Sequence, residues 1–276
     1  MQLCYQVATP DIAVAPTVTS YQGDLDTSFR AIYALGYDGA ELMTVDPDQL
    51  DWAQVKALAE HYSLSIPLVC TGEVYGQIGI SFVDPDPSRQ KIAIDRMRRI
   101  IDFAAYLGAD VNVGRIRGQY TPSVPRQTTY DTAASVFREL SAYAAQKKIS
   151  IALETINTLQ SNFINTMAEG DRFVSAVGSP NFRLMADIFH MNMEEKDLCR
   201  SIQKYADNTI YVHLSDSNRR YPGSAGSDFA KVIRTFRESG YNGTFTVEIM
   251  QLPNQQTAAQ RSIEYLRPIF SRFYTE

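Results

Sequence analysis

Eight short apolar runs alternate with longer amphipathic segments along this chain, and this alternation restricts its fold more than any other feature. Between the runs, apolar residues recur at helical spacing, as Ala93, Met97 and Ile101 do within 88–107. Strands that alternate with helices build a parallel sheet. The runs lie at 3–7, 40–43, 65–69, 110–114, 149–153, 182–186, 209–212 and 244–247.

Eight strand-and-helix units in 276 residues predict an α/β fold, a single (β/α)₈ TIM barrel that spans residues 1–276. An open sheet fits this length and repeat number less well. No G-x-G-x-x-G follows the first run, which argues against a dinucleotide-binding Rossmann domain. No stretch rich in Pro, Gly or Ser divides the chain.

Residues at the ends of the amphipathic segments predict where helices begin and end. Asp51 is expected to open one helix, and Gly36 to end the helix before it. Ser227 is expected to cap a later helix, because a serine side chain can accept from a free amide of the first turn. A weaker helix is expected near 194–205.

The charge pattern excludes several classes of function. The net charge is −5 with no long block of one sign, which argues against binding to nucleic acid or to a membrane surface. No run of about 18 apolar residues and no signal-peptide pattern is present. The three cysteines, Cys4, Cys70 and Cys199, form neither a disulfide framework nor a C-x-x-C pair. We expect a cytoplasmic protein whose partner is a small molecule.

Polar residues end the last four apolar runs. Glu154, Asp187, His213 and Glu248 follow one another at intervals of 33, 26 and 35 residues, each about one strand-and-helix unit. In TIM barrels the catalytic groups lie at the carboxyl ends of the strands. The four side chains are therefore expected to converge on one rim of the barrel.

A cation is the simplest reason for such a set. Burying three carboxylates and one imidazole close together is unfavourable unless a cation balances their charge. Mn²⁺, Mg²⁺ and Co²⁺ suit this oxygen-rich set, and Zn²⁺ is an alternative. Any one of the four alone could be a solvent-facing charge, but four in consecutive units favour a metal site. Glu41 and Asp216 stay open, either as hydrogen-bond partners of the site or as acceptors within loops.

Two arginines and one glycine-rich loop could recognise an anion. Arg115 and Arg117 follow the fourth run, where they could hold a phosphate or carboxylate of a substrate, or form salt bridges with neighbouring loops. The loop 223–227 leads into a helix whose amino terminus could receive an anion. Loop closure by its glycines is the simpler interpretation.

Around these residues the sequence resembles the sugar isomerase and epimerase group of xylose-isomerase-like TIM barrels, which includes ketose 3-epimerases. The resemblance runs over nearly the whole chain. It is carried by G-Y-D-G-A-E-L at 36–42, I-A-L-E-T-I-N at 151–157, M-A-D-I-F-H-M-N at 185–192, V-H-L-S-D-S-N-R at 212–219, P-G-S-A-G-S-D-F at 222–229 and F-T-V-E at 245–248.

The resemblance implies roles for the matching positions. The four residues that end the last strands would hold one divalent ion, with Mn²⁺ expected first. Glu154 and Glu248 would also exchange protons with the substrate from its two faces, while His190 and Arg219 would hold substrate oxygens. The implied activity is isomerisation or epimerisation of a ketose, ketose phosphate or other keto sugar, by deprotonation next to the carbonyl through a metal-stabilised enediolate. Related barrels form dimers or tetramers, so a homo-oligomer is expected.

The sequence departs from the ketose 3-epimerase pattern in the loop after Glu154. The position six residues on, usually a Glu, is Gln160, and a frequent Arg of that loop is replaced by Thr158. An amide can hydrogen-bond a substrate hydroxyl, but it cannot act as a carboxylate. Gln160 is therefore expected to contact the substrate, and free-ketose 3-epimerisation is not the only activity to consider.

Three alternative functions would make different demands on these residues. The same metal and bases could serve a lyase that cleaves a C-glycoside of a 3-keto sugar or dehydrates an inosose. A non-catalytic sugar-binding barrel would not need the complete pair of Glu154 and Glu248. An endonuclease IV-type barrel needs a histidine-rich site with three metal ions, whereas this chain has three histidines, of which His61 falls in a predicted helix.

Overall fold

Eight parallel strands close into a barrel in which each strand pairs with its neighbours in the sequence and β8 pairs with β1. This arrangement comes from a computed structural model, which describes residues 1–274. It confirms the predicted α/β TIM barrel. The strands are β1 (Gln2–Ala8), β2 (Gly39–Met43), β3 (Leu68–Cys70), β4 (Asp110–Val113), β5 (Ile151–Glu154), β6 (Phe182–Asp187), β7 (Thr209–Leu214) and β8 (Thr244–Val247).

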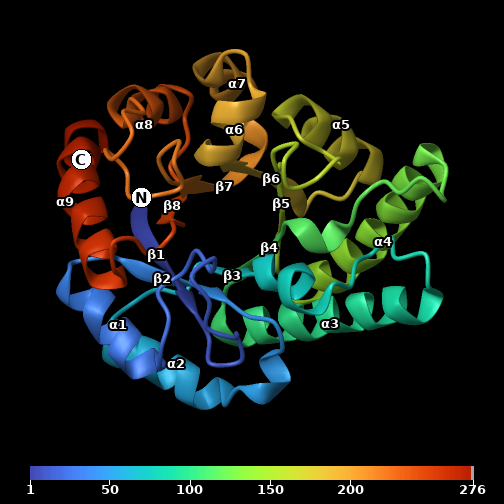
Figure 1. Ribbon diagram of the computed structural model, residues 1–276, viewed down its shortest axis with the longest axis horizontal. Coiled ribbons are helices and arrows are strands. Elements are labelled where there is room, and N and C mark those ends of the chain that lie inside the picture. The colour runs from blue at the N-terminus through green and yellow to red at the C-terminus, as the bar shows by residue number, and fades with distance from the viewer. Residues whose placement is uncertain (275–276) are drawn as a thin grey trace.

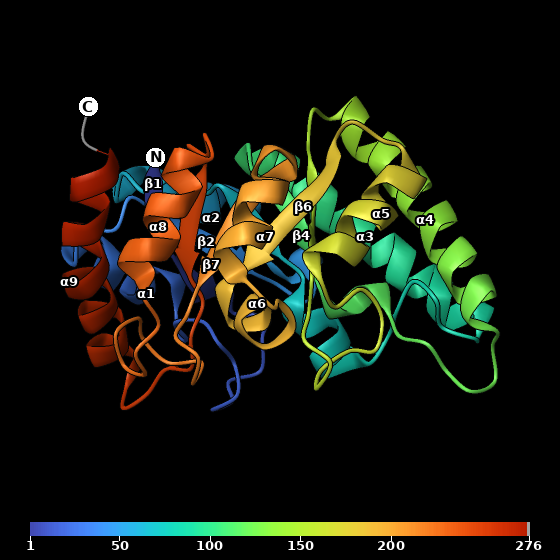
Figure 2. The same ribbon diagram turned by 90° about the horizontal axis from the view of Figure 1, so that it is seen from above.

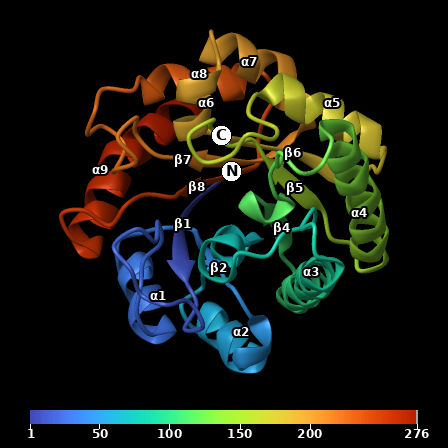
Figure 3. The same ribbon diagram turned by 45° about the vertical axis from the view of Figure 1, so that its right-hand side comes forward.

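The α-helices form a ring around the strands (Figures 1 and 3). They are α1 (Leu25–Ala34), α2 (Trp52–His61), α3 (Pro87–Leu107), α4 (Arg126–Gln146), α5 (Met167–Val177), α6 (Ile188–Glu194), α7 (Leu198–Tyr205), α8 (Phe229–Glu238) and α9 (Gln255–Tyr274). Short helical turns lie at η1 (Pro47–Gln49), η2 (Val74–Ile78), η3 (Arg115–Arg117) and η4 (Ala206–Asn208). Within residues 1–274, no helix is both long enough and apolar enough to cross a bilayer.

The helices pack through the apolar faces that the sequence predicts. Met97, Ile100 and Ile101 of α3 are wholly buried, whereas Arg98 and Arg99 on its outer side form ion pairs at the surface. Each large apolar side chain buried in this way contributes about 1.5–3 kcal/mol. Together these contacts hold the strands rigidly and fix the positions of their carboxyl ends.

Two predicted helix boundaries are wrong. The helix expected near 194–205 is α7, which begins only at Leu198, and a separate helix that was not predicted, α6, lies before it and begins directly after β6. The cap of α8 is Asp228, whose carboxylate accepts from the amide of Lys231, and not Ser227. Ser227 instead donates from its hydroxyl to Asp216, at 2.6 Å. By contrast, Asp51 caps α2 as predicted.

The long loops gather at one end of the barrel (Figure 2). These loops follow the carboxyl ends of the strands, which parallel strands direct to the same rim. Asp187, the last residue of β6, pairs in register with His213 of β7, and Glu154 ends β5. Glu248 directly follows β8. The fold therefore brings the four predicted metal ligands to one place.

Candidate metal centre and active site

The four residues predicted from the spacing form one buried cluster. Glu154, Asp187, His213 and Glu248 each offer a ligand atom, and these atoms all lie within 4.8 Å of one another. The Nδ1 atom of His213 lies 3.8 Å from Asp187 Oδ2 and 3.9 Å from Glu154 Oε1. Oxygen and imidazole donors at this separation can converge on one divalent ion.

Glu41 determines which nitrogen of His213 faces the cluster. The Nε2 atom of His213 lies 2.8 and 2.9 Å from the two carboxylate oxygens of Glu41, which is itself wholly buried. Within residues 1–274, the buried Nδ1 atom makes no hydrogen bond, although Glu248 Oε2 lies 2.8 Å away. A carboxylate on one ring nitrogen that leaves the other free is the usual arrangement around a metal-bound histidine. Glu41, left open by the sequence, is thus a partner of the site.

The charges in the cluster also fit a cation. Burial, together with the carboxylates of Glu248 and Asp187, raises the pKa of Glu154 to about 8. Burial opposes ionisation of Glu248 as well, but Arg219 and His213 outweigh it and lower its pKa to about 2. Burial favours a neutral His213, yet Glu41 and Glu248 raise its pKa well above the ordinary value. A bound cation would relieve the repulsion among the carboxylates and replace the proton on His213 Nδ1.

Arg219 lies over the cluster from the loop after β7. Its Nη1 atom donates to Asp187 Oδ2 at 2.7 Å, and its Nη2 atom donates to Glu248 Oε2. The residue adopts a left-handed backbone conformation, with φ 59°. Its guanidinium packs over Phe189, 4.7 Å from the ring centroid. The structure therefore places Arg219 beside the four residues of the cluster.

His190 lies in the first turn of α6, beside the cluster. Burial lowers its pKa to about 4, so the ring is neutral near pH 7. Its Nδ1 atom lies 2.7 Å from Asn157 Nδ2, a donor, so we assign the ring proton to Nε2. Nε2 lies 3.7 Å from Glu154 Oε1 and 3.8 Å from Asp187 Oδ2. The Nε2 atom of His190 can thus donate a hydrogen bond beside the cluster, in the cavity that His190 helps to line.

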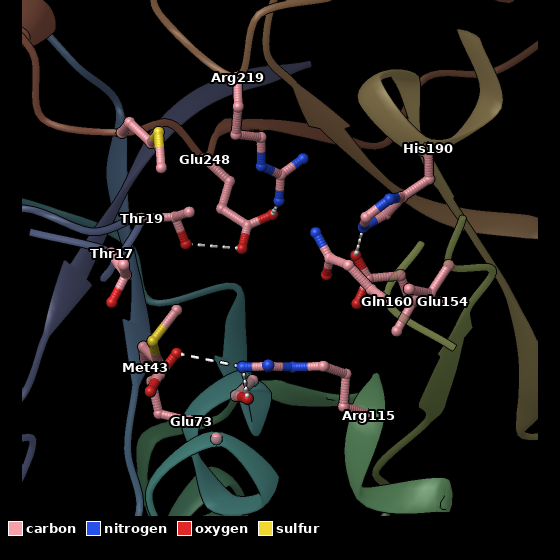
Figure 4. Close-up of a pocket in the computed structure, with 14 residues that line it drawn as sticks. Thr17, Thr19, Met43, Glu73, Arg115, Glu154, Gln160, His190, Arg219 and Glu248 are labelled. Carbon is pink, nitrogen blue, oxygen red and sulfur yellow. Dashed lines mark hydrogen bonds and ion pairs between the residues drawn. The ribbon is translucent and has the colours of Figure 1, made fainter. Parts of the chain in front are cut away.

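A cavity of about 340 Å³ opens onto the cluster. In Figure 4, Glu248 and Thr19 lie on one side of it, and Glu154, His190 and Gln160 lie on the other. Arg219 and Arg115 extend into it from opposite walls (Figure 4). The lining residues are Thr17, Thr19, Met43, Gly72, Glu73, Gly76, Arg115, Glu154, Ile156, Gln160, His190, Arg219, Glu248 and Met250. The predicted candidates Gln160 and Arg115 therefore both line the cavity.

Arg117 does not line this cavity, so the suggestion that it could grip a substrate anion is wrong. Its side chain is wholly buried, and it donates to the backbone oxygens of Gly114, Glu154, Phe163 and Ile164. It joins the turn after β4 to the loop after β5. Its guanidinium supplies side-chain donors to these buried backbone carbonyls.

The backbone amides of the loop 223–227 bind a carboxylate of the protein itself. The carboxylate of Asp216 accepts from the backbone amides of Gly223, Ala225 and Ser227. These amides are therefore already paired, which favours loop closure over binding of a substrate anion. Asp216, the second residue left open by the sequence, is an acceptor within its loop.

Thr19 and Glu73 are residues of the cavity that the sequence did not single out. The hydroxyl of Thr19 donates to Glu248 Oε1 at 2.9 Å, and Glu73 lies 3.3 Å from the guanidinium of Arg115. Both lie in loops that follow strands, β1 and β3 respectively. Their place after a strand is a sequence signal that points to them. Many other polar residues share that place, so the signal does not single them out.

Comparisons with known proteins agree with this geometry. The sequence model of a family described as "Xylose isomerase-like TIM barrel" matches residues 29–269. The chain is 32% identical to L-ribulose 3-epimerase of Methylomonas sp. (strain DH-1) over 220 residues, which are 77% of this chain and 74% of that protein. It is 27% identical to 3-dehydro-D-guloside 4-epimerase of Escherichia coli (strain K12) over 230 residues, which are 80% and 85% of the two chains.

Among solved structures, the fold is similar to that of D-psicose 3-epimerase from Clostridium cellulolyticum H10, determined with D-tagatose. The TM-score is 0.83 at 20% sequence identity, and the match covers 98% of this chain and 99% of the other. At this identity the likeness supports the fold. It agrees with the closed barrel described above.

Proposed function

Because this chain belongs to the xylose isomerase-like TIM barrel family, we propose that it is a divalent-metal-dependent epimerase of a ketose or another keto sugar. The observation that carries the proposal is the placement of Glu154 and Glu248. Both belong to the buried four-residue cluster, and they face the cavity from different sides (Figure 4). The two relatives named above are epimerases of keto sugars by name, which supports the same reaction type.

The chemistry requires a proton to leave the substrate on one face and return on the other. One of the two residues, Glu154 or Glu248, takes the proton from the carbon next to the carbonyl as a carboxylate, and the other, as a protonated carboxylic acid, donates its own proton to the opposite face. A divalent ion held by the four residues of the cluster, with Mn²⁺ expected first, would supply Lewis-acid stabilisation of the negative charge that develops.

The remaining residues of the cavity orient the sugar. His190 presents its Nε2 proton, and Arg219 presents guanidinium donors beside the reacting carbons. Gln160 offers an amide that can both donate to and accept from a hydroxyl. Thr19 holds Glu248 Oε1 through a hydrogen bond, which restricts the carboxylate to one orientation. Fixed positions of this kind hold the reacting groups in the right geometry, which lowers the barrier to the reaction.

Elimination is the other reaction that the same groups could perform, and the named relatives do not favour it. The two outcomes differ in mass. An epimer has the mass of its substrate, whereas elimination releases water or a fragment. A non-catalytic sugar-binding barrel would bind without either change.

The test is to load the protein with Mn²⁺ and incubate it with ketoses, ketose phosphates and 3-keto-glycosides in D₂O. We expect one substrate class to give an epimer with one solvent deuterium at the inverted carbon, measured by mass spectrometry and NMR. Parallel samples with Co²⁺, Mg²⁺ and Zn²⁺ identify the preferred ion.

The same assay checks the acid and base. Glu154→Gln and Glu248→Gln should each lower the rate by about 10²–10⁴-fold, since each removes a positioned proton carrier. Glu60→Gln is the matched control, because Glu60 is exposed on α2 and lies away from the cavity. Full activity in either cavity variant would contradict the proposed pair.

A further inference from the structure

We propose that Glu73 and Arg115 form a subsite that recognises adjacent hydroxyl groups at the end of the sugar remote from its reacting carbons. The inference rests on the proposed epimerase function and deepens it by naming the substrate class. The substrate would be a keto sugar whose far end is hydroxylated and carries no phosphate or carboxylate.

The two residues share the wall of the cavity that faces Arg219 (Figure 4). Arg115 Nη2 donates to Gly72 O at 3.1 Å and to Glu73 Oε1 at 3.3 Å. The side chains are 31% and 16% exposed, so the pair is held in place yet open to the cavity. A sugar bound near Arg219 by its reacting carbons would direct its other end toward this wall.

Because Gly76 has no side chain, Glu73 and Arg115 can occupy the space beside it. A Cβ atom at this position would lie 2.7 Å from Arg115 Nη2 and 2.8 Å from Glu73 Oε2. Both distances are shorter than van der Waals contact, so any other residue would displace the guanidinium or the carboxylate. The absence of a side chain at position 76 thus keeps the pair where it can meet a ligand.

The pair offers donors and acceptors side by side. Within residues 1–274, Nη2 is the only atom of the Arg115 guanidinium that makes a hydrogen bond, which leaves Nε and Nη1 as donors. The carboxylate of Glu73 supplies acceptors. Each hydroxyl of a vicinal diol can both accept and donate one hydrogen bond, so two neighbouring hydroxyls match a guanidinium and a carboxylate in contact.

The same arrangement disfavours an anion. Because Glu73 lies against Arg115, the two charges cancel in large part, and a phosphate would meet a carboxylate as well as a guanidinium. The cavity wall also carries Glu154 and Glu248. Arg115 alone would suggest an anion, whereas the pair favours a neutral, hydroxylated group.

Within residues 1–274, the rest of the cavity lining offers no Phe, Tyr or Trp ring to bind the sugar, so polar groups must distinguish one sugar from another. Of the described residues that line the cavity, none is Phe, Tyr or Trp, so no such ring is present for a sugar face to stack on. The apolar side chains of the lining are Met43, Ile156 and Met250. A site that hydrogen-bonds a substrate hydroxyl binds an analogue without that hydroxyl more weakly, because the polar groups of the site then have no partner.

The test compares three probes on the Mn²⁺-loaded protein: D-fructose, 6-deoxy-D-fructose and D-fructose 6-phosphate. Binding is measured by calorimetric titration, and exchange of the C3 hydrogen is measured separately in D₂O. We expect D-fructose to bind at least ~10-fold more tightly than either analogue. Arg115→Met should remove the preference over the 6-deoxy sugar, and Gly76→Ala should weaken it.

Glu73→Gln is the sharpest variant, because it leaves the guanidinium without its counter-charge. It should raise the affinity for the 6-phosphate relative to D-fructose by ~10-fold or more. Arg200→Met and Glu60→Gln, both exposed and outside the cavity, should keep the wild-type ratios. These controls match the change in charge of the two main variants.

A wild-type protein that binds D-fructose no better than its 6-deoxy form, or that prefers the phosphate, would overturn the subsite. Unchanged binding ratios in both Arg115→Met and Glu73→Gln would do the same. The expected ratios without hydrogen exchange would contradict the epimerase function alone, since the subsite is judged by binding.

Discussion

At the scale of single residues, Glu41 shows how a side chain outside the cavity can control the site. It is wholly buried, accepts from Gln6 Nε2 at 2.8 Å and lies against His213 Nε2. These contacts fix the carboxylate, which in turn fixes the plane of the imidazole. The direction in which His213 Nδ1 points therefore depends on a residue two strands beyond the end of the cluster around the closed barrel.

Replacing Glu41 should weaken metal binding without removing a ligand. We expect Glu41→Gln to lower the affinity for Mn²⁺ by about 10–100-fold, because the partner of a metal-bound histidine has an effect of this size. Calorimetric titration of the metal-free protein measures it. Glu60→Gln, exposed on α2, should leave the affinity unchanged. Equal affinities in Glu41→Gln and the wild type would show that His213 needs no such support.

At the scale of elements, the loop between β7 and α8 is organised around one carboxylate. Asp216 accepts from Ser217 N, Gly223 N, Ala225 N and the hydroxyl of Ser227. This same loop carries Arg219, whose amide donates to Asp216 O at 2.8 Å. The place of Arg219 over the cluster is thus a property of the loop as a unit.

Asp216→Asn should therefore destabilise the protein by about 1.5–3 kcal/mol, the size of a hydrogen-bond contribution from a charged group. Urea unfolding at pH 7 measures the loss. Asp228→Asn is the matched control, because it caps α8 and asparagine caps as well as aspartate. An equal loss in both variants would contradict the special role of Asp216.

The pH dependence of the same loop follows from its hydrogen bonds. Burial opposes ionisation of Asp216, but donors from Ser227, Ala225 and Ser217 outweigh it and lower its pKa. Its stabilisation is therefore fully present above the unfolded pKa, about 3.9, and is lost as the pH falls through the lower folded pKa. The difference between Asp216→Asn and the wild type should shrink below about pH 4.

At the scale of the whole molecule, the four proposed metal ligands lie at the ends of four consecutive strands, so a bound ion would join a large part of the barrel. An ion that binds only the folded state stabilises it by about 2.7 kcal/mol at a hundred times its dissociation constant. For a chain of this size, we expect Mn²⁺ to raise the Tm by roughly 5–10 °C and EDTA to reverse the change. Differential scanning calorimetry measures it.

Asp187→Asn is the control for this effect. It replaces one carboxylate of the cluster with a neutral amide, a weaker ligand, and the shift with Mn²⁺ should fall to a small fraction of the wild-type value. A full shift in this variant would show that the ion binds elsewhere. Because the readout is the Tm, it does not depend on knowing the substrate.

The sequence by itself determined the barrel and its four-residue cluster. Repeating apolar runs set the number of strands, and because parallel strands end on one rim, the residues that end them must meet there. For the same reason, Glu154, Asp187, His213 and Glu248 could be found from spacing alone. Within the fold, the errors concerned helix boundaries, as at Ser227, where two neighbouring residues were both good caps.

Only the tertiary structure decided what the loop side chains do. Arg115 and Arg117 lie two residues apart, yet the turn of η3 sends one into the cavity and the other into the protein interior. Glu73 meets Arg115, and Glu41 meets His213, across more than 40 residues of sequence. Strand ends follow from the local repeat, whereas these partnerships depend on how distant loops pack against one another.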